Sequence, residues 1–304
     1  ARRYYTDSQQ LDERIPRSRF GLAKTYEQLA LSTIATELTD PAKASREAKE
    51  ASKDPKAGEK PTPLGSAIQL LQKAQKLDDS PSIVRNLATA LILQGSAPEA
   101  ERLVASSIAT TGKSDPLLWV LQARIQGQQK QLPQAAESAD RAVTEAKKQL
   151  DTLPVAEAGR KPLVLKLLAT ARVEQAARYV ALDASRTAAP SAKDRERIDS
   201  AIDGMQQAVR DLSSASGADG KELQKAAQRN LQLLYLRRAR LRLMEAEAHI
   251  GRSGVTQQTT KEAEDALSDV QKAVELGSFE HKPELGYAQC LGSLAGAQAN
   301  QFKA

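Results

Sequence analysis

Aromatic side chains and cysteine are both scarce in this sequence of 304 residues. Phe, Trp and Tyr make up 3% of it, which excludes a large core built on aromatic rings and leaves Ala and Leu to fill the interior between closely spaced helices. The one cysteine, Cys290, excludes an intrachain disulfide and a zinc site built on thiolates. We expect Cys290 to be a small buried hydrophobe. Such sparing use of cysteine suits a cytoplasmic and a periplasmic protein equally well, so the compartment stays open.

Long apolar runs and the motifs of catalysis are missing as well. No run of about 18 apolar residues predicts a transmembrane segment. Gly112-Lys113-Ser114 looks like the end of a phosphate-binding loop, but Ser107 stands where that loop needs a glycine. The histidines are His249 and His281, and the pair Glu245–His249 falls short of the three or four ligands that zinc requires. We therefore expect no cofactor, no metal site and no enzymatic activity.

Good helix formers dominate what is present, and β-branched residues are scattered, so we predict an all-α protein. The chain has 44 basic and 38 acidic residues, a formal charge of +6. Both signs are interspersed along most of the chain, which is typical of a solvated helical surface. A dedicated nucleic-acid binder would concentrate its basic residues in a stripe.

A short pattern recurs five times: Ala, three residues, an apolar residue, two residues, then Ala or Ser. This spacing places all three residues on one face of a helix, where small residues allow close packing. Successive patterns start 33, 35, 66 and 65 residues apart, which predicts a repeat protein. The members are Ala67-Leu71-Ala74, Ala100-Val104-Ser107, Ala135-Ala139-Ala142, Ala201-Met205-Ala208 and Ala266-Val270-Ala273.

Proline and glycine divide the chain into helices joined by short turns, which predicts antiparallel hairpins. Glycines are expected to end the later helices, at Gly217, Gly220, Gly251, Gly254 and Gly277. The longest predicted helix, residues 221–250, carries two apolar strips. These indicate a helix that is contacted from both sides. The predicted helices are 20–38, 64–77, 82–94, 98–110, 116–129, 132–150, 161–183, 191–212, 221–250, 258–276 and 283–302.

The unit from Pro81 to Ser114 resembles a tetratricopeptide repeat, a pair of antiparallel helices of about 34 residues. Matching positions are Leu87-Ala88, Leu91, Gly95, Ala100 and Val104, and the next unit supplies Trp119, Ala123, Ala135 and Ala142. The resemblance is clearest over residues 67–150. It implies a right-handed α-solenoid of helical hairpins, with the first helix of each hairpin lining a concave groove and Trp119 filling the space inside its unit. The later hairpins are elongated.

This organisation predicts an N-terminal arm over residues 1–19 and tetratricopeptide-like repeats over 20–150, interrupted by a charged insertion at about 39–63. Elongated hairpins and an unpaired final helix follow over 151–304, continuous with the first array. An unpaired final helix suggests that the array continues into other domains or subunits, so the chain would belong to a larger assembly.

The family resemblance implies a non-catalytic scaffold that binds a protein or peptide in its groove. The groove candidates by offset are Arg85, Asn86, Thr89, Val120 and Arg124. Their arginines favour an acidic ligand. Two alternatives stay open: a nucleic-acid-binding repeat protein, and an enzyme built on convergent carboxylates.

The most basic helical stretch is residues 237–242, where Arg238 and Arg242 lie one turn apart. They would form a patch for phosphate or an acidic partner if their charges were free. Glu245 and Glu247 follow closely, and we expect them to pair with Arg242 and Arg240 respectively on a solvated face.

Overall fold

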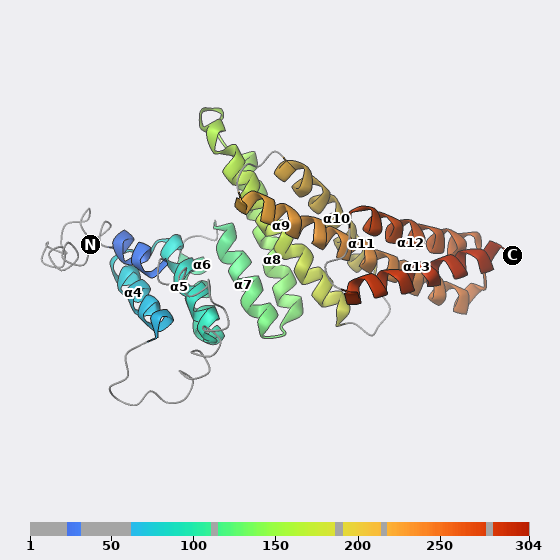
Figure 1. The fold of residues 1–304 in the computed structure, drawn as a ribbon, viewed down its shortest axis with the longest axis horizontal. Helices are drawn as coiled ribbons and strands as arrows, with labels where there is room; N and C mark the ends of the chain where they lie inside the picture. Colours follow the sequence, from blue (N-terminus) through green and yellow to red (C-terminus); the bar gives the residue numbers. More distant parts are fainter. Residues whose placement is uncertain are drawn as a thin grey trace, which may run out of the picture. The chain divides into compact units, whose positions relative to one another are not determined.

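The computed structural model describes residues 23–31, 62–110, 115–185, 191–213, 218–277 and 282–303. Within these ranges every regular element is a helix. The chain forms two compact units, residues 1–129 and 130–304, which are described separately (Figure 1). The predicted N-terminal arm and all but the end of the predicted charged insertion lie outside the described residues.

The first unit contains a helix at residues 23–31 and four longer ones, α4 (Pro63–Leu77), α5 (Pro81–Gln94), α6 (Ala97–Thr110) and α7 (Pro116–Gln128). Proline occupies the first turn of α4, α5 and α7, where its missing N–H costs nothing. Thr62 and Asp115 cap α4 and α7 by accepting hydrogen bonds from the backbone N–H of Gly65 and Leu117.

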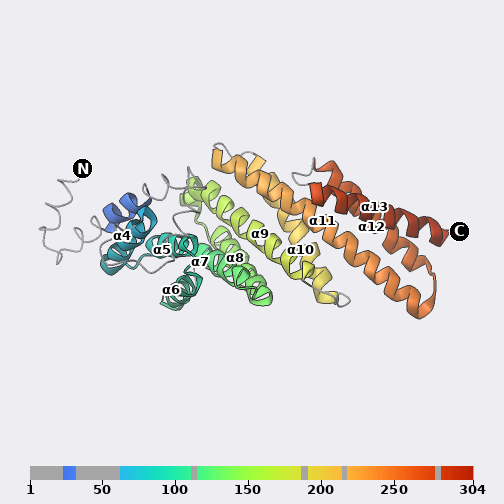
Figure 2. The ribbon, with the colours of Figure 1, turned by 60° about the horizontal axis from the view of Figure 1, so that its bottom comes forward.

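The second unit contains longer helices that lie side by side (Figure 2). They are α8 (Leu132–Asp151), α9 (Lys161–Ala184), α10 (Ala192–Ser213), α11 (Ala218–Ser253), α12 (Gln257–Glu275) and α13 (Lys282–Lys303). A short 3₁₀ helix, η1 (Val155–Arg160), joins α8 to α9. The predicted helices agree with these bounds to within three residues wherever the structure describes them.

The recurring small-residue pattern lies on α4, α6, α8, α10 and α12, and every member is buried, with at most 6% of its surface exposed. It therefore marks the helices that alternate with α5, α7, α9, α11 and α13. In the second unit one continuous core runs from Ala136 on α8 to Ala295 on α13, with Met205 and Leu236 fully buried inside it.

The helices are arranged as an α-solenoid of antiparallel hairpins, in two layers. In the first unit α5 contacts α7, and in the second α9 contacts α11 and α11 contacts α13. Helices α8, α10 and α12 pack instead on their neighbours in the chain. We call α5 and α7 the inner layer of the first unit, and α9, α11 and α13 the inner layer of the second. The prediction that α11 is contacted from both sides is confirmed, because it packs on α9, α10, α12 and α13.

The structure contradicts the sequence-based prediction at three residues, Gly220, Gly251 and Cys290. Gly254 and Gly277 do end helices, with φ of 71° and 127°, but Gly220 and Gly251 lie inside α11. Gly217 lies outside the described residues. Cys290 is exposed rather than buried, because Ala288, Leu291 and Ala295 form the face of α13 that meets the core.

Over residues 288–301, the side of α13 that faces away from the core carries mainly polar and small residues. The exposed positions in this range are Gln289, Cys290, Ser293, Leu294, Ala297, Asn300 and Gln301. Among these positions Leu294 alone is a large hydrophobe, and it is 44% exposed. The expectation that further repeats cover this helix stays a prediction.

None of the described helices combines the length and the apolar character needed to cross a membrane.

Candidate functional site

The groove residues predicted from the sequence lie on α5 and α7, two helices that contact each other in the inner layer of the first unit. Thr89 and Arg124 are exposed, whereas Val120 is only 3% exposed and belongs to the core. The Thr89 hydroxyl donates to the carbonyl oxygen of Arg85 at 2.8 Å. Thr89 and Arg124 are therefore the members of the set that are exposed.

Arg85 connects the two helices. Its guanidinium pairs with the carboxylate of Asp115, and the same carboxylate caps α7 by accepting from the N–H of Leu117 at 2.9 Å. The Arg85 side chain is still 26% exposed, so one edge of it remains accessible beside Thr89. Arg85 thus positions α7 against α5.

Asn86 joins α5 to the helix at residues 23–31. Its side-chain amide donates to Glu27 Oε1 at 2.8 Å, and Lys24 Nζ donates to Glu27 Oε2 at 2.6 Å. Glu27 is only 3% exposed, so these two partners satisfy a carboxylate that has lost its water. Asn86 serves here to hold two helices together.

One exposed apolar residue of this surface was missed from the sequence. Leu93 on α5 is 44% exposed and follows Arg85 and Thr89 at intervals of four residues. The three side chains therefore form one stripe along α5. The spacing was visible in the sequence, but a leucine at such a position is by default assigned to the core. We call Arg85, Thr89, Leu93 and Arg124 the α5–α7 surface.

The arginines at residues 237–242 lie on α11 in the second unit and pair with aspartates of other helices. Arg238 donates to both carboxylate oxygens of Asp269 on α12, at 2.8 and 2.6 Å, and to Asp199 on α10 at 2.7 Å. Arg242 Nη1 reaches the same Asp269 at 2.9 Å. Burial opposes the charged form of Arg238, but the hydrogen bonds to Asp269 and Asp199 outweigh it and raise its pKa.

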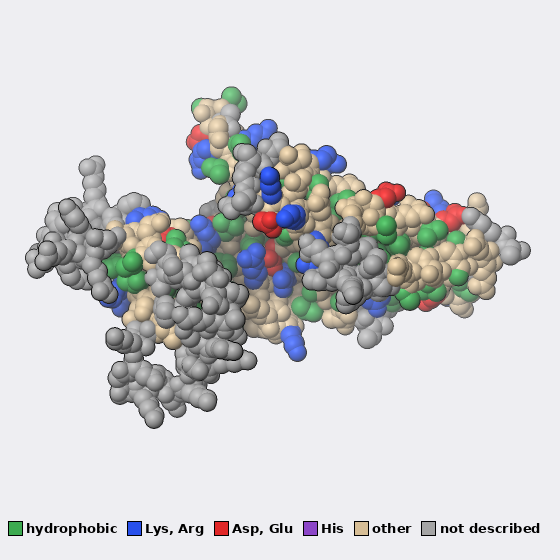
Figure 3. Space-filling view, viewed as in Figure 1, with side chains coloured by type: hydrophobic (Ala, Val, Ile, Leu, Met, Phe, Trp, Pro, Cys, Tyr) green, Lys and Arg blue, Asp and Glu red, His purple; other side chains and the backbone are tan. Residues whose placement is uncertain are grey.

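The other two arginines of this stretch, Arg237 and Arg240, lie 3.8 and 3.9 Å from the carboxylate of Asp183 on α9. The predicted pairings within α11 are wrong, since Glu245 pairs with Arg195 of α10 at 2.9 Å and Glu247 accepts from Gln298 of α13 at 3.2 Å. The stretch connects α9, α10, α11 and α12, so it is not an open phosphate-binding patch. On the face shown in Figure 3, basic and acidic side chains of this unit are interspersed.

His249 forms a polar contact between α11 and α12. Its Nδ1 lies 3.2 Å from Glu262, while Glu245 turns toward Arg195. Burial raises the pKa of Glu245, although Arg195 opposes the shift. Within the described ranges no group of three or more His, Cys, Asp or Glu side chains is arranged to hold a metal ion. His281 and Gly112-Lys113-Ser114 lie outside those ranges.

No protein-family model matches the chain, and a search of curated proteins gave no match. Among solved structures, the chain is similar to a tetratricopeptide repeat protein from Parabacteroides merdae ATCC 43184. The two are 15% identical with a TM-score of 0.30, and the match covers 90% of this chain and 99% of the other. At that level of similarity the architecture rests on the helix packing described above.

Proposed function

We propose that this chain is a non-catalytic helical-repeat scaffold that binds another protein or a peptide on the inner layer of its helices. We further propose that the hairpins between residues 67 and 150 are tetratricopeptide-like units. The observation that carries the proposal is the inner layer itself: neighbouring helices α5 and α7 contact each other and jointly expose the α5–α7 surface.

The chemistry of the α5–α7 surface favours a partner that carries both acidic and apolar side chains. Arg124 and the accessible edge of Arg85 supply positive charge, and the Thr89 hydroxyl supplies a polar contact. Leu93 adds an exposed apolar side chain to this surface. Guanidinium groups recognise carboxylates with directional, charge-assisted hydrogen bonds. An extended acidic segment or an amphipathic helix of a partner fits this combination.

Nucleic-acid binding is less well supported than protein binding. The most basic stretch of the chain is paired with Asp183, Asp199 and Asp269, so its charges are compensated within the second unit. Binding to a phosphate backbone needs cations that can neutralise the phosphates and release the counterions condensed on them.

Affinity capture with the intact chain, followed by mass spectrometry, tests this proposal when it is run with two matched variants. Arg124→Glu reverses a charge on the α5–α7 surface. Arg102→Glu reverses the charge of an exposed arginine on α6, which lies in the other layer of the same unit. We expect a specific partner to be lost with Arg124→Glu and retained with Arg102→Glu. Partners that survive both changes, or disappear with both, would contradict binding at the α5–α7 surface.

A further inference from the structure

The turn that joins α8 to α9 carries the two most exposed large hydrophobic side chains among the described residues. Val155, the first residue of η1, is 94% exposed, and Leu163, in the first turn of α9, is 68% exposed. Pro154, next to Val155, is exposed as well. Single exposed apolar residues are common, but several at one turn mark a surface that meets another molecule. We call residues 147–166 the α8–α9 tip.

The start of α9 reaches beyond the two helices that pack beside it. Gln175 of α9 donates to Asp140 of α8 at 2.9 Å, and from this contact α9 runs about one turn further than α8 does. On the other side, Arg172 lies 3.9 Å from Asp211, close to the described end of α10. Figure 1 shows this end of the hairpin projecting from the second unit, and Figure 3 shows hydrophobic side chains at its extremity with basic ones behind them.

Positive charge is concentrated at the α8–α9 tip. Its residues include five basic and two acidic side chains, a net charge of +3 out of the chain's formal +6. Arg160 and Lys161 are exposed at the apolar end, where Arg160 pairs with Glu157. Lys148 and Lys166 lie roughly 7–9 Å behind the start of α9, at the rise of an α-helix. Cations therefore follow directly behind the exposed apolar end.

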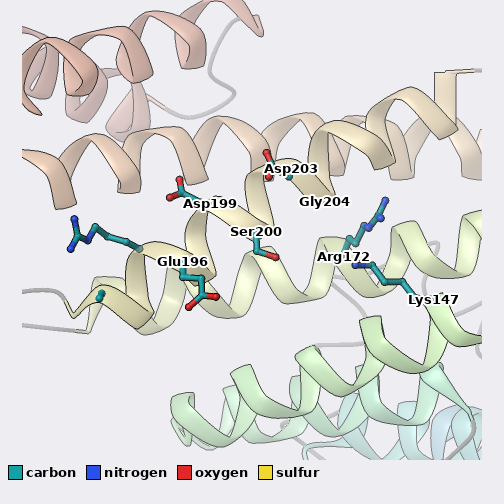
Figure 4. A pocket seen from close by; sticks show the side chains of 9 residues that line it. Lys147, Arg172, Glu196, Asp199, Ser200, Asp203 and Gly204 are labelled. Atoms are coloured by element: carbon teal, nitrogen blue, oxygen red, sulfur yellow. The ribbon is translucent and has the colours of Figure 1, made fainter. Parts of the chain in front are cut away.

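The surface behind the α8–α9 tip has balanced charge. An open pocket of about 690 Å³ lies there between α8, α9 and α10, and Arg172 and Gly204 are among its lining residues (Figure 4). Three basic and three acidic side chains line this pocket, including Lys147 at the border of the tip. The excess of positive charge thus belongs to the tip and not to the pocket behind it.

The start of α9 departs from the preferences that stabilise a helix. Its N-cap is Arg160, whose side chain makes no capping hydrogen bond, and its first turn has no acidic residue. The positive end of the helix dipole favours Asp or Glu at such positions and disfavours Arg160 and Lys161. Leu163, in the same turn, remains largely in water. Local preferences that are broken without a gain inside the fold are expected at functional sites.

We infer that the α8–α9 tip docks on the surface of a membrane that contains anionic phospholipids. Interfacial segments place their apolar side chains about 5–10 Å into the boundary between headgroups and acyl chains. At that depth Val155 and Leu163 lie in apolar surroundings, while Lys148 and Lys166 lie level with the lipid phosphates. A membrane offers this order of apolar and anionic groups on a flat surface, whereas a protein would need an apolar socket with an acidic rim. The tip shares no residue with the α5–α7 surface, so this inference does not rest on the function proposed above.

Co-sedimentation of the full chain with lipid vesicles tests the inference. One set of vesicles is phosphatidylcholine alone, and the other is an equimolar mixture of phosphatidylcholine and phosphatidylglycerol. We expect the chain to sediment with the mixed vesicles and to stay in solution with the neutral ones. Binding to the mixed vesicles should weaken as salt is added, because the cations of the tip are exposed to the screening ions.

Two double variants connect the binding to the apolar end. Val155→Ser with Leu163→Ser should lower the partition coefficient on mixed vesicles by at least about tenfold, since two apolar side chains no longer enter the lipid. Val255→Ser with Val274→Ser makes the same kind of change at side chains that are 54% and 53% exposed elsewhere in the second unit. This control should bind as the wild type does. All four positions are exposed, so circular dichroism should show the same helix content in both variants.

Charge reversal separates membrane binding from stability at the start of α9. Lys161→Glu should raise the melting temperature, because an acidic residue suits the first turn of a helix, and should weaken binding to mixed vesicles by at least about fivefold. Lys193→Glu makes the same change at an exposed position in the first turn of α10. It should leave vesicle binding unchanged. A purely structural role of Lys161 does not produce higher stability together with weaker binding.

A tryptophan placed at the apex reports contact with lipid directly. The native Trp119 is only 7% exposed, so its emission should not change when vesicles are added. Val155→Trp should give an emission that shifts to shorter wavelength with mixed vesicles and stays unchanged with neutral ones.

Four results would overturn the inference. They are the absence of wild-type binding to mixed vesicles, equal binding to neutral vesicles, unchanged binding by the double serine variant of the tip, and an unshifted emission of Val155→Trp. A protein that is captured by the wild type and lost with the double serine variant, in the absence of vesicle binding, would assign the tip to a protein partner instead.

Discussion

Replacing Asp269 with alanine is the sharpest test of the claim that the arginine-rich stretch of α11 is structural. Asp269 is fully buried and accepts hydrogen bonds from Arg238 Nε and Nη2 at 2.8 and 2.6 Å. It also forms an ion pair with Arg242, whose Nη1 lies 2.9 Å away. Its removal would leave Arg238 with Asp199 and Arg242 with the carbonyl oxygen of Asp265. Two partly buried cations would then lack their shared counterion.

The expected cost follows from how far water can reach the two arginines. Removing one partner of a fully buried ion pair destabilises a protein by about 3–5 kcal/mol. The side chains of Arg238 and Arg242 are 17% and 26% exposed, so water replaces part of what is lost. We therefore expect Asp269→Ala to lower the free energy of unfolding by about 2–4 kcal/mol. Because the carboxylate is buried, most of the loss should persist at high salt.

Asp199→Ala is the matched control, since it removes a second carboxylate from the same Arg238. The Asp199 side chain is 53% exposed, and exposed ion pairs contribute about 0–1 kcal/mol. Urea unfolding followed by circular dichroism measures both variants. If Asp269→Ala costs no more than Asp199→Ala, the arginines do not depend on the buried carboxylate and the structural reading of this stretch is refuted.

Further predictions concern the core, the helix ends and pH. Met205 is fully buried in the core of the second unit, so Met205→Ala should cost about 2–5 kcal/mol in urea unfolding, and a cost near zero would mean the core is not packed as described. Gly254 has a φ of 71° whereas Gly251 lies inside α11 with open space around it, so alanine should destabilise by about 1 kcal/mol at the first and stabilise by a similar amount at the second. Thermal melts that shift in the same direction for both would contradict this. Burial raises the pKa of Glu245 in the folded chain above its unfolded value. Between these two pKa values the folded chain binds more protons than the unfolded chain. The contribution of Glu245 to the free energy of unfolding therefore falls as pH rises through the folded pKa. Unfolding titrations between about pH 4 and pH 7 should show that fall in the wild type and not in Glu245→Gln.

The helices and their order were predictable because the sequence marks them locally. Proline at the start of α4, α5 and α7 and glycine after α5 and α12 fix where helices begin and end. The small-residue pattern also identified the buried face of alternate helices, since its period is that of the helix.

Contacts between helices were less predictable, because they depend on which faces meet in three dimensions. Local spacing suggested that Arg242 and Arg240 pair with Glu245 and Glu247 of the same helix, but their partners lie on α12 and α9. Asp269 is fully buried, so its carboxylate depends on the two guanidinium groups for charged partners. The apposition of Arg172 and Gly204 across α9 and α10 has no local signal at all.

Hydrogen–deuterium exchange of the chain with and without its captured partner tests the central claim most directly. Binding to the inner layer predicts slower exchange in peptides from α5 and α7, around Leu93 and Arg124, with α4 and α6 unchanged. Protection confined to α4 and α6, with α5 and α7 exchanging as in the free chain, would contradict it.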